Sequence, residues 1–481
     1  MSVYLGTEKI SVYTGGIISK PEEEKTVTAG TSVIEVLPSS GKTMKKVTIN
    51  PAPIPTELVL TPPTKTSYTA GEALDLTGIA VKAKFNNGTE QYVTSECTFN
   101  PANDTVLYED TSEVVISWNY GDAITFTTTQ AITVKPNTTI YGVEWDGTST
   151  TTWTRTDAAE LFTNPVPYVS GASSYGSPFD NCSPWKDMQI VNDVTAGKLV
   201  SIPKYYYKWT KTGSTMKLQI ADGPVDGFHV SPAHADRGDG KGERDVVYVG
   251  RYHCNSSYKS VAGSTPLGNM TRATARTNIH NLGSTYWQYD FAMYWTICML
   301  YLVEFADWNS QAKIGYGCSP SGSKWNVGYT DSMPYHTGTT ASARTSYGGT
   351  QYRYIEGLWD NVFDWCDGIY FSGANVYCIK NPASFSDSSG GTLVGTRPTS
   401  GGWISAFNVP TANGFEYALY TSAISGSENT YITDYCGSGG VVLFVGGFYY
   451  QYQYYGLFSL GGDSSASSAY SYVGSRLQKL P

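Results

Sequence analysis

Charged residues are scarce in this chain. They make up 15% of its 481 residues and leave a net charge of −9. No run of Lys and Arg is present, so the chain lacks the positive surface with which a sequence-neutral nucleic-acid binder displaces counterions. We therefore expect no nucleic-acid partner. With so few charges, the polar surface must come mainly from Ser, Thr, Asn, Gly and Tyr.

A long hydrophobic run is also missing. The most apolar stretch, Phe291 to Phe305, has about 15 residues, whereas a helix needs about 20 to cross a bilayer. The first residues, MSVYLGTEKI, contain no basic segment followed by an apolar one, so we expect no Sec signal peptide. Both observations predict a protein that does not insert into a membrane.

Sequence motifs of common catalytic and metal sites are missing as well. The eight Cys form no CxxC pair, and neither GxSxG nor HExxH occurs. Because no signal peptide is expected, we interpret most Cys as buried thiols, although their even number permits disulfides. His229 and His234 are five residues apart and would not stack on one helical face, so isolated polar contacts are favoured over metal binding.

One acidic segment could suggest a calcium loop. Asp236–Glu243 alternates oxygen ligands with glycines, but it lacks the EF-hand spacing, and Arg237 and Lys241 would repel a cation. A solvated turn is therefore favoured. Other carboxylates are scattered, with no pair placed for glycoside hydrolysis. We predict no catalytic residue, no metal site and no cofactor, and hence a protein that is not an enzyme.

What the chain does contain predicts a mainly β protein with some α. Gly and Tyr are abundant, at 50 and 38 residues. Residues 1–55 form an N-terminal β segment that is too small to hold a core alone. Residues 56–136 contain short β-rich runs with a hairpin signal at Asn86-Asn87-Gly88, which predicts an Ig-like β-sandwich. This stretch resembles the bacterial Ig-like modules of surface and phage proteins, which act as spacers.

From about Thr139 the composition shifts towards Trp, Tyr and Gly, and one region continues to Pro481. Its apolar pattern predicts helices at Thr271–Leu282 and Trp287–Trp308. The second is apolar almost all round and is therefore expected to be buried. Short strands and long polar loops make up the rest, which predicts an α+β domain.

The end of this region is rich in Tyr and Ser. Between Val441 and Ser475 there are seven Tyr and one Asp, with neither Lys nor Glu. Tyr and Ser dominate antibody combining sites because Tyr offers a large amphipathic contact and Ser offers adaptable hydrogen bonds. Buried Tyr hydroxyls would each need a partner, so a surface is favoured over a core. A Tyr-rich edge strand with oligomeric contacts is the alternative interpretation. The candidate ligand-binding residues are Phe448, Tyr449, Tyr450, Tyr452, Tyr454, Tyr455, Asp463, Ser464, Ser468, Tyr470 and Tyr472.

Three stretches of residues 139–481, taken in order, resemble a known family: Leu302–Gly315, Glu356–Gly368 and the tail from Gly446 to Leu477. The second is similar to the G-N-V-W-E-W signature of the formylglycine-generating-enzyme subgroup of the C-type lectin fold. The third is similar to the closing strands of the variable proteins of diversity-generating retroelements. The resemblance implies a C-type lectin fold with a variable tail at about residues 446–475.

The resemblance also implies how the tail arises and what it does not do. Such retroelements mutate template adenines, which turns Asn codons into codons for Tyr, Ser, Asp and others. Formylglycine-generating enzymes bind copper through a late pair of Cys, whereas the last 100 residues here hold only Cys436. The core aromatics Trp359, Phe363 and Trp365 are expected to keep the scaffold rigid rather than to contact a ligand.

These observations imply a phage receptor-binding protein at a tail fibre or baseplate, located in the virion. Residues 1–55 would attach to other phage tail proteins, and the C-terminal domain would bind a bacterial surface protein or glycan receptor. A homotrimer would add avidity. Two alternatives remain open: a cellular surface adhesin or lectin diversified by a retroelement, and an oxidase of the formylglycine-generating type.

Overall fold

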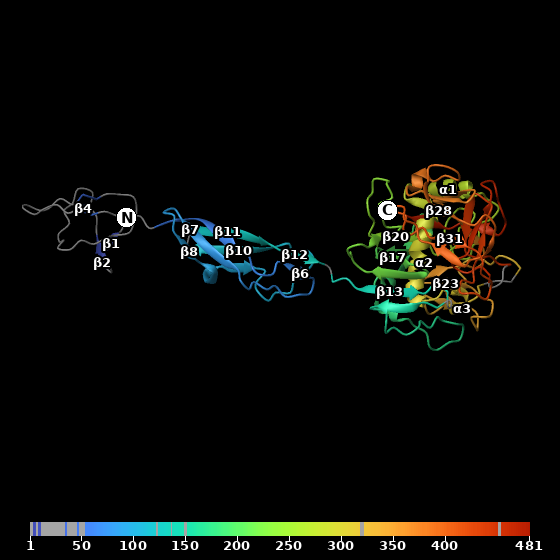
Figure 1. The fold of residues 1–481 in the computed structure, drawn as a ribbon, viewed down its shortest axis with the longest axis horizontal. Coiled ribbons are helices and arrows are strands. Elements are labelled where there is room, and N and C mark those ends of the chain that lie inside the picture. The colour runs from blue at the N-terminus through green and yellow to red at the C-terminus, as the bar shows by residue number, and fades with distance from the viewer. Residues whose placement is uncertain are drawn as a thin grey trace, which may run out of the picture. The chain divides into compact units, whose positions relative to one another are not determined.

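The structure is a computed structural model in which the chain divides into two compact units, Met1–Asn137 and Thr138–Pro481 (Figure 1). It describes residues 53–121, 124–135, 137–148, 152–317, 322–450 and 454–481. It also describes four short strands that form two antiparallel pairs: β1 (Val3–Leu5) with β2 (Glu8–Ile10), and β3 (Ile34–Glu35) with β4 (Lys46–Val47). The rest of the predicted β segment, up to residue 52, lies outside the described residues.

Besides these four short strands, the described part of the first unit contains two three-stranded antiparallel sheets and one parallel pair of strands. One sheet has the order β5-β7-β8, the other β11-β10-β9, and β6 pairs with β12. The strands are β5 (Pro55–Thr61), β6 (Ser67–Thr69), β7 (Ala80–Phe85), β8 (Glu90–Tyr92), β9 (Thr98–Asn100), β10 (Glu113–Tyr120), β11 (Ile124–Ala131) and β12 (Thr133–Lys135).

Local sequence explains these strands. The predicted hairpin joins β7 to β8, and Gly88 adopts a φ of +83° that favours glycine in such turns. In β10, Val114, Ile116 and Trp118 alternate with more exposed residues and are buried in the core of this unit. The indole of Trp118 donates a hydrogen bond of 2.9 Å to Glu96.

The second unit is built from three larger sheets and several short ones. The first has the order β14-β13-β18-β17-β19, the second β15-β16-β20-β36-β21, and the third β29-β32-β34-β33-β25-β35. The short sheets are β22-β23-β24, β26-β27-β28 and β30-β31.

The first two large sheets comprise β13 (Ile140–Trp145), β14 (Thr154–Asp157), β15 (Gln189–Asp193), β16 (Gly197–Pro203), β17 (Tyr206–Thr212), β18 (Thr215–Ala221), β19 (His229–Val230), β20 (Val246–Gly250), β21 (Tyr286–Gln288) and β36 (Leu477–Lys479). The third comprises β25 (Phe363–Cys366), β29 (Gly402–Trp403), β32 (Tyr435–Gly437), β33 (Val442–Val445), β34 (Leu460–Ser464) and β35 (Val473–Gly474). The short sheets comprise β22 (Gly338–Thr339), β23 (Thr350–Tyr352), β24 (Ile355–Glu356), β26 (Ile369–Ser372), β27 (Asn375–Cys378), β28 (Thr392–Thr396), β30 (Ala406–Asn408) and β31 (Tyr420–Ala423).

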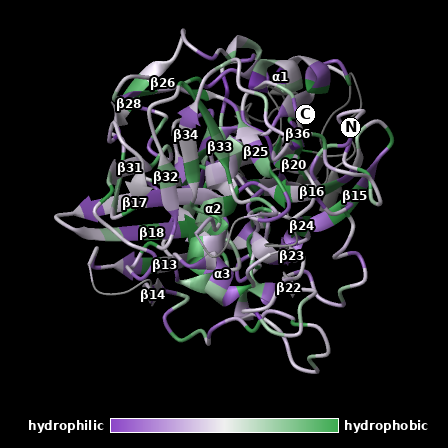
Figure 2. Ribbon diagram, turned by 90° about the vertical axis from the view of Figure 1, so that its right-hand side faces the viewer, coloured by the Kyte–Doolittle hydropathy of each residue, from purple (hydrophilic) through white to green (hydrophobic). Residues whose placement is uncertain are grey.

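Helix α2 (Phe291–Phe305) lies in the interior of this unit, with all of its 15 residues buried (Figure 2). The prediction of a buried helix is confirmed, but its predicted bounds, 287–308, were too wide. The carboxylate of Asp290 accepts a hydrogen bond of 2.8 Å from the Met293 N–H and so caps the first turn. Ala306, with a φ of +51°, ends the helix.

The other helices are short. Helix α1 (Arg272–His280) falls within the predicted 271–282, and Thr271 caps it by accepting a hydrogen bond from the Thr274 N–H. Helix α3 covers Ser310–Lys313. Four 3₁₀ turns are η1 (Thr94–Glu96), η2 (Pro178–Asn181), η3 (Trp185–Asp187) and η4 (Pro382–Ser384). The fold is therefore mainly β with some α, as predicted.

Seven cysteines lie in the described residues, and all seven are free thiols. Six are buried and Cys97 is half-buried, which confirms the interpretation of most Cys as buried thiols. Cys318 lies outside the described residues. Among the helices that the structure describes, none combines the length and the apolar character needed to cross a membrane.

Candidate functional site

The Tyr-rich tail forms two loops around strand β34. The first loop, residues 446–459, connects β33 to β34, and the second loop, residues 465–472, connects β34 to β35. The first loop contains five of the candidate residues: Phe448, Tyr449, Tyr450, Tyr454 and Tyr455. The second loop contains Ser468, Tyr470 and Tyr472, and β34 contains Asp463 and Ser464. Tyr452 lies outside the described residues.

Side chains of the two loops meet over Phe363 of β25. The ring centroid of Phe363 is 5.1 Å from that of Phe448 and 5.5 Å from that of Tyr455, both in the first loop. Phe448 stacks on Tyr472 of the second loop at 4.7 Å, and Tyr472 stacks on Tyr470 at 5.1 Å. The structure therefore brings together aromatic candidates that lie more than 15 residues apart in the sequence. We call Phe448, Tyr449, Tyr450, Tyr454, Tyr455, Tyr470 and Tyr472 the aromatic surface.

The row of rings continues beyond the tail. Tyr435 of β32 lies 6.0 Å from Tyr455, and Trp403 of β29 lies 5.3 Å from Tyr454 and 5.8 Å from Tyr435. Sequence reasoning missed Trp403 and Tyr435. Nothing in the local sequence marks them, because only the order of strands in the third sheet places them beside the first loop.

The aromatic surface is accessible, but not uniformly so. Tyr450 is 66% exposed, and the other described members are half-buried. Asp463 and Ser464 are neighbours in β34, so their side chains point to opposite faces of the sheet. Asp463 is exposed, whereas Ser464 is 2% exposed. The prediction that Ser464 contacts ligand is therefore wrong, because it did not take account of the alternation along this internal strand.

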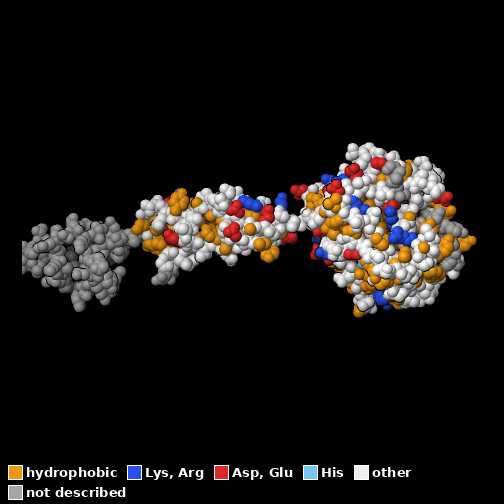
Figure 3. All heavy atoms as spheres, turned by 90° about the horizontal axis from the view of Figure 1, so that it is seen from below, with side chains coloured by type: hydrophobic (Ala, Val, Ile, Leu, Met, Phe, Trp, Pro, Cys, Tyr) orange, Lys and Arg blue, Asp and Glu red, His pale blue; other side chains and the backbone are white. Residues whose placement is uncertain are grey.

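Charged side chains are sparse on the surface of the larger unit. Figure 3 shows one face of the molecule, on which uncharged polar atoms and hydrophobic side chains far outnumber charged ones in the larger unit. This agrees with the low charge content of the sequence. The members of the aromatic surface are themselves uncharged, so their contacts with a ligand would depend on aromatic burial and hydrogen bonding more than on ion pairs.

The ends of the first loop are fixed by close backbone contacts. A Cβ on Gly446 would lie 2.4 Å from the Leu358 carbonyl oxygen, and one on Gly447 would lie 2.5 Å from that of Trp359, so only glycine fits at either position. At the other end, the Leu457 N–H donates a hydrogen bond of 2.9 Å to the Ser310 hydroxyl. The rings therefore stand on a backbone that is held at both ends.

A buried carboxylate holds the same end of the loop. Asp434 accepts hydrogen bonds from the N–H groups of Gly456 and Phe458, the latter at 2.9 Å. Burial raises the pKa of Asp434 to about 7, although the two backbone donors act in the opposite direction. Phe458 itself is fully buried against Trp308, with ring centroids 4.9 Å apart.

The three stretches that carry the family resemblance contact one another. The Trp359 indole of the second donates a hydrogen bond of 3.0 Å to the Gly315 carbonyl of the first. The Asp364 carboxylate of the second forms an ion pair of 3.0 Å with Arg476 of the third. Trp359, Phe363 and Trp365 are all buried, which confirms the expectation that they are core aromatics.

The other candidates of the sequence form internal contacts. In the segment 236–243, Arg237 forms an ion pair of 2.8 Å with Asp290, and Asp239 forms an ion pair with the neighbouring Arg244. His234 is buried between the Ser231 hydroxyl at 2.7 Å and the Ile202 carbonyl at 2.9 Å. His229 is exposed on β19. His234 therefore makes isolated polar contacts, as the five-residue spacing of His229 and His234 predicts.

Comparison with known families identifies one part of the chain. Residues 61–114, which lie within the first unit, match the bacterial Ig-like domain (group 3). The chain therefore contains a bacterial Ig-like domain, as the β-rich pattern predicts. Domains of this kind are typical of surface and phage-associated proteins. A comparison with the curated proteins finds no match.

Proposed function

We propose that this chain is a phage receptor-binding protein whose aromatic surface binds a protein or glycan on the bacterial surface. The observation that carries the proposal is the meeting of two Tyr-rich loops over Phe363, with their rings half-buried and accessible. Binding requires no catalytic group, and we propose that the protein is not an enzyme.

The packing of the rings favours recognition. Phe448, Tyr470 and Tyr472 are stacked on one another, so each ring has already lost much of its conformational freedom. A ligand that covers these rings therefore gains apolar burial at a small entropic cost. Tyr hydroxyls at the exposed edge can donate and accept hydrogen bonds, which suits both sugars and polypeptide backbones.

The remaining parts of the proposal concern the whole particle. We propose that residues 1–55 attach to other phage tail proteins in the virion and that the Ig-like domain is a spacer. Residues 139–481 would form a C-type lectin fold. A homotrimer would present three aromatic surfaces and gain affinity by avidity. Diversification by a retroelement would explain why Tyr and Ser are concentrated in the two loops.

A cellular surface adhesin is the second candidate, because bacterial Ig-like domains are also typical of surface proteins. The two candidates differ in the neighbourhood of the gene, which would encode tail proteins in the first case. Oxidase chemistry of the formylglycine-generating type has less support. It needs a late pair of Cys, and the buried Cys436 is alone in the last 100 residues.

A cell-binding assay tests the proposal. The fluorescently labelled full chain is incubated with bacterial strains from the community that carries the gene. A strain bound by the wild-type chain is then tested with Tyr450→Ala/Tyr470→Ala, which removes one ring from each loop. The matched control is Tyr92→Ala/Tyr108→Ala, because these Tyr of the Ig-like domain are 66% and 67% exposed, close to the 66% of Tyr450.

We expect at least a tenfold loss of cell binding in the loop variant and no change in the control. Equal binding by both variants, or equal loss in both, would contradict the assignment of binding to the aromatic surface. Binding to no strain at all, with the chain folded and the community well sampled, would also count against a receptor-binding function.

A further inference from the structure

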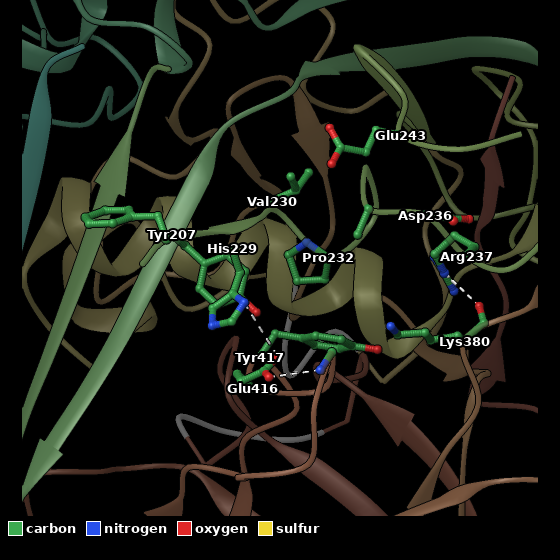
Figure 4. A pocket seen from close by; sticks show the side chains of 13 residues that line it. Tyr207, His229, Val230, Pro232, Asp236, Arg237, Glu243, Lys380, Glu416 and Tyr417 are labelled. Carbon is green, nitrogen blue, oxygen red and sulfur yellow. Dashed lines mark hydrogen bonds and ion pairs between the residues drawn. The ribbon is translucent and has the colours of Figure 1, made fainter. Parts of the chain in front are cut away.

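The larger unit contains a second candidate site, which shares no residue with the aromatic surface. A cavity of about 330 Å³ opens beside β17 and β19, and the segments around Arg237, Lys380 and Glu416 form its other walls (Figure 4). This volume lies at the lower end of the range of ligand pockets, roughly 300 to 1,000 Å³. It suits a small ligand rather than a polymer.

Two polar atoms on the residues that line this cavity have no hydrogen-bond partner within the described structure. One carboxylate oxygen of Glu416 accepts a hydrogen bond of 2.9 Å from the Gly414 N–H. The other, Oε2, lies 3.9 Å from His229 Nδ1, beyond hydrogen-bond distance, and accepts no hydrogen bond. Arg237 is 2% exposed and donates through Nε to the Lys380 carbonyl at 2.7 Å and through Nη2 to Asp290 at 2.8 Å. Its Nη1 donates to nothing. An unsatisfied buried donor or acceptor is costly, so a ligand that satisfied both atoms would be favoured.

The charges around the cavity are of both signs. Lys380 and Arg237 would repel a metal ion, and Glu416, Asp236 and Glu243 would repel an anion. Figure 4 shows Arg237 and Lys380 on one side of the cavity and Glu416 with His229 on the other. An uncharged ligand with both donors and acceptors avoids either repulsion.

The walls also contain apolar rings. Tyr207, Pro232 and Tyr417 line the cavity, and all three are mostly buried. A sugar ring has hydroxyls that both donate and accept hydrogen bonds, and C–H faces that pack on apolar rings. We propose that this cavity binds one neutral sugar residue, with hydroxyls bonded to Glu416 Oε2 and Arg237 Nη1. The inference goes beyond the proposed receptor binding, because it concerns different residues.

Two variants of the full chain test this site. Glu416→Gln keeps an oxygen for the Gly414 N–H but replaces Oε2, which accepts no hydrogen bond, with an amide NH₂, which cannot accept one. Ala235→Phe places a ring in the open space of the cavity, which the half-exposed Ala235 lines. The matched control is Glu160→Gln, because Glu160 is exposed in the same unit and lies outside the cavity.

Binding is measured by saturation-transfer difference NMR with D-glucose, D-galactose, N-acetyl-D-glucosamine and L-rhamnose, each titrated alone. Glycine and inorganic phosphate are titrated in parallel, and thermal unfolding confirms that each variant is folded. We expect saturable binding of at least one sugar, weakened at least tenfold by Glu416→Gln and by Ala235→Phe and unchanged by Glu160→Gln.

Three results would overturn the proposal: binding of none of the sugars, sugar binding that both cavity variants retain, and binding of glycine or phosphate in place of sugars. The variant Tyr450→Ala/Tyr470→Ala separates this site from the aromatic surface. It should bind sugar as the wild type does, even where it no longer binds cells.

Discussion

Two sets of residues in the C-terminal tail differ in what they contact. Gly456, Leu457 and Phe458 are buried and hydrogen-bonded to Asp434 and Ser310. The members of the aromatic surface lie a few residues away in the same loops. Several of them pack on one another and over Phe363, but all remain half-buried or exposed. One set therefore holds the loops and the other is displayed by them. Because the most exposed side chains of these loops are not the ones that hold them, we expect changes at the exposed positions to leave the fold intact.

The largest expected effect is at a buried position of the first loop. Phe458 packs against Trp308, Tyr301 and Trp295 with no exposed area. Phe458→Ala should therefore lower the free energy of unfolding by about 3 to 5 kcal/mol. Urea denaturation of the full chain measures the loss, with Tyr450→Ala, at an exposed position of the same loop, as the control. A similar loss in both variants would show that the displayed rings are part of the core.

A smaller loss of stability is expected at Asp434. Asn has one oxygen, so Asp434→Asn leaves one of the two backbone donors, Gly456 or Phe458, facing an NH₂ group. At pH 5 we expect a loss of about 1 to 3 kcal/mol in the free energy of unfolding. Unchanged stability at this pH would mean that the hydrogen bonds to Asp434 do not hold the loop.

The same carboxylate makes stability depend on pH. The pKa of Asp434 is about 7 in the folded chain because of burial, against roughly 3.9 in an unfolded chain. Between these values the folded state keeps a proton that the unfolded state has released, so the free energy of unfolding falls as the pH rises from 4 to 7. The decline should be shallower in Asp434→Asn by up to about 1.4 kcal/mol per pH unit. Glu356, whose pKa burial also raises to about 7, contributes in the same direction in both chains. Parallel curves for the two chains would contradict the raised pKa of Asp434.

The smallest change in stability is expected at the displayed position Tyr450. Tyr450 is 66% exposed, so Tyr450→Ala should change the free energy of unfolding by less than about 0.5 kcal/mol. The equally exposed Tyr108 of the Ig-like domain provides the control, as Tyr108→Ala. A loss above 1 kcal/mol at Tyr450 alone would place this residue among those that hold the loop.

Features set by local sequence could be predicted. The Asn86-Asn87-Gly88 hairpin follows from turn chemistry, and the buried helix α2 follows from an apolar run without a polar face. The ends of α2 could not be read from the same run. Residues 286–288 pair instead with β36, almost 200 residues further along the chain, and Asp290 caps the helix behind them.

The candidate site could be predicted in part. Composition identifies the Tyr-rich loops, but it cannot show that Ser464 faces the interior of the sheet while Asp463 is exposed. It also cannot reveal Trp403 and Tyr435, which only the strand order brings to the first loop. Asp434 gives no local signal either, because its partners lie more than 20 residues away.

The tail is proposed to consist of residues that hold the loops and residues that the loops display. Deep sequencing of the gene in a population of single origin distinguishes the two sets. We expect substitutions to concentrate at adenine-derived codons of the displayed positions, such as Tyr449, Tyr450 and Tyr470. Gly456, Leu457, Phe458 and Gly474 should remain constant. Substitutions spread evenly over the tail, or a tail without any variation, would contradict a diversified binding surface.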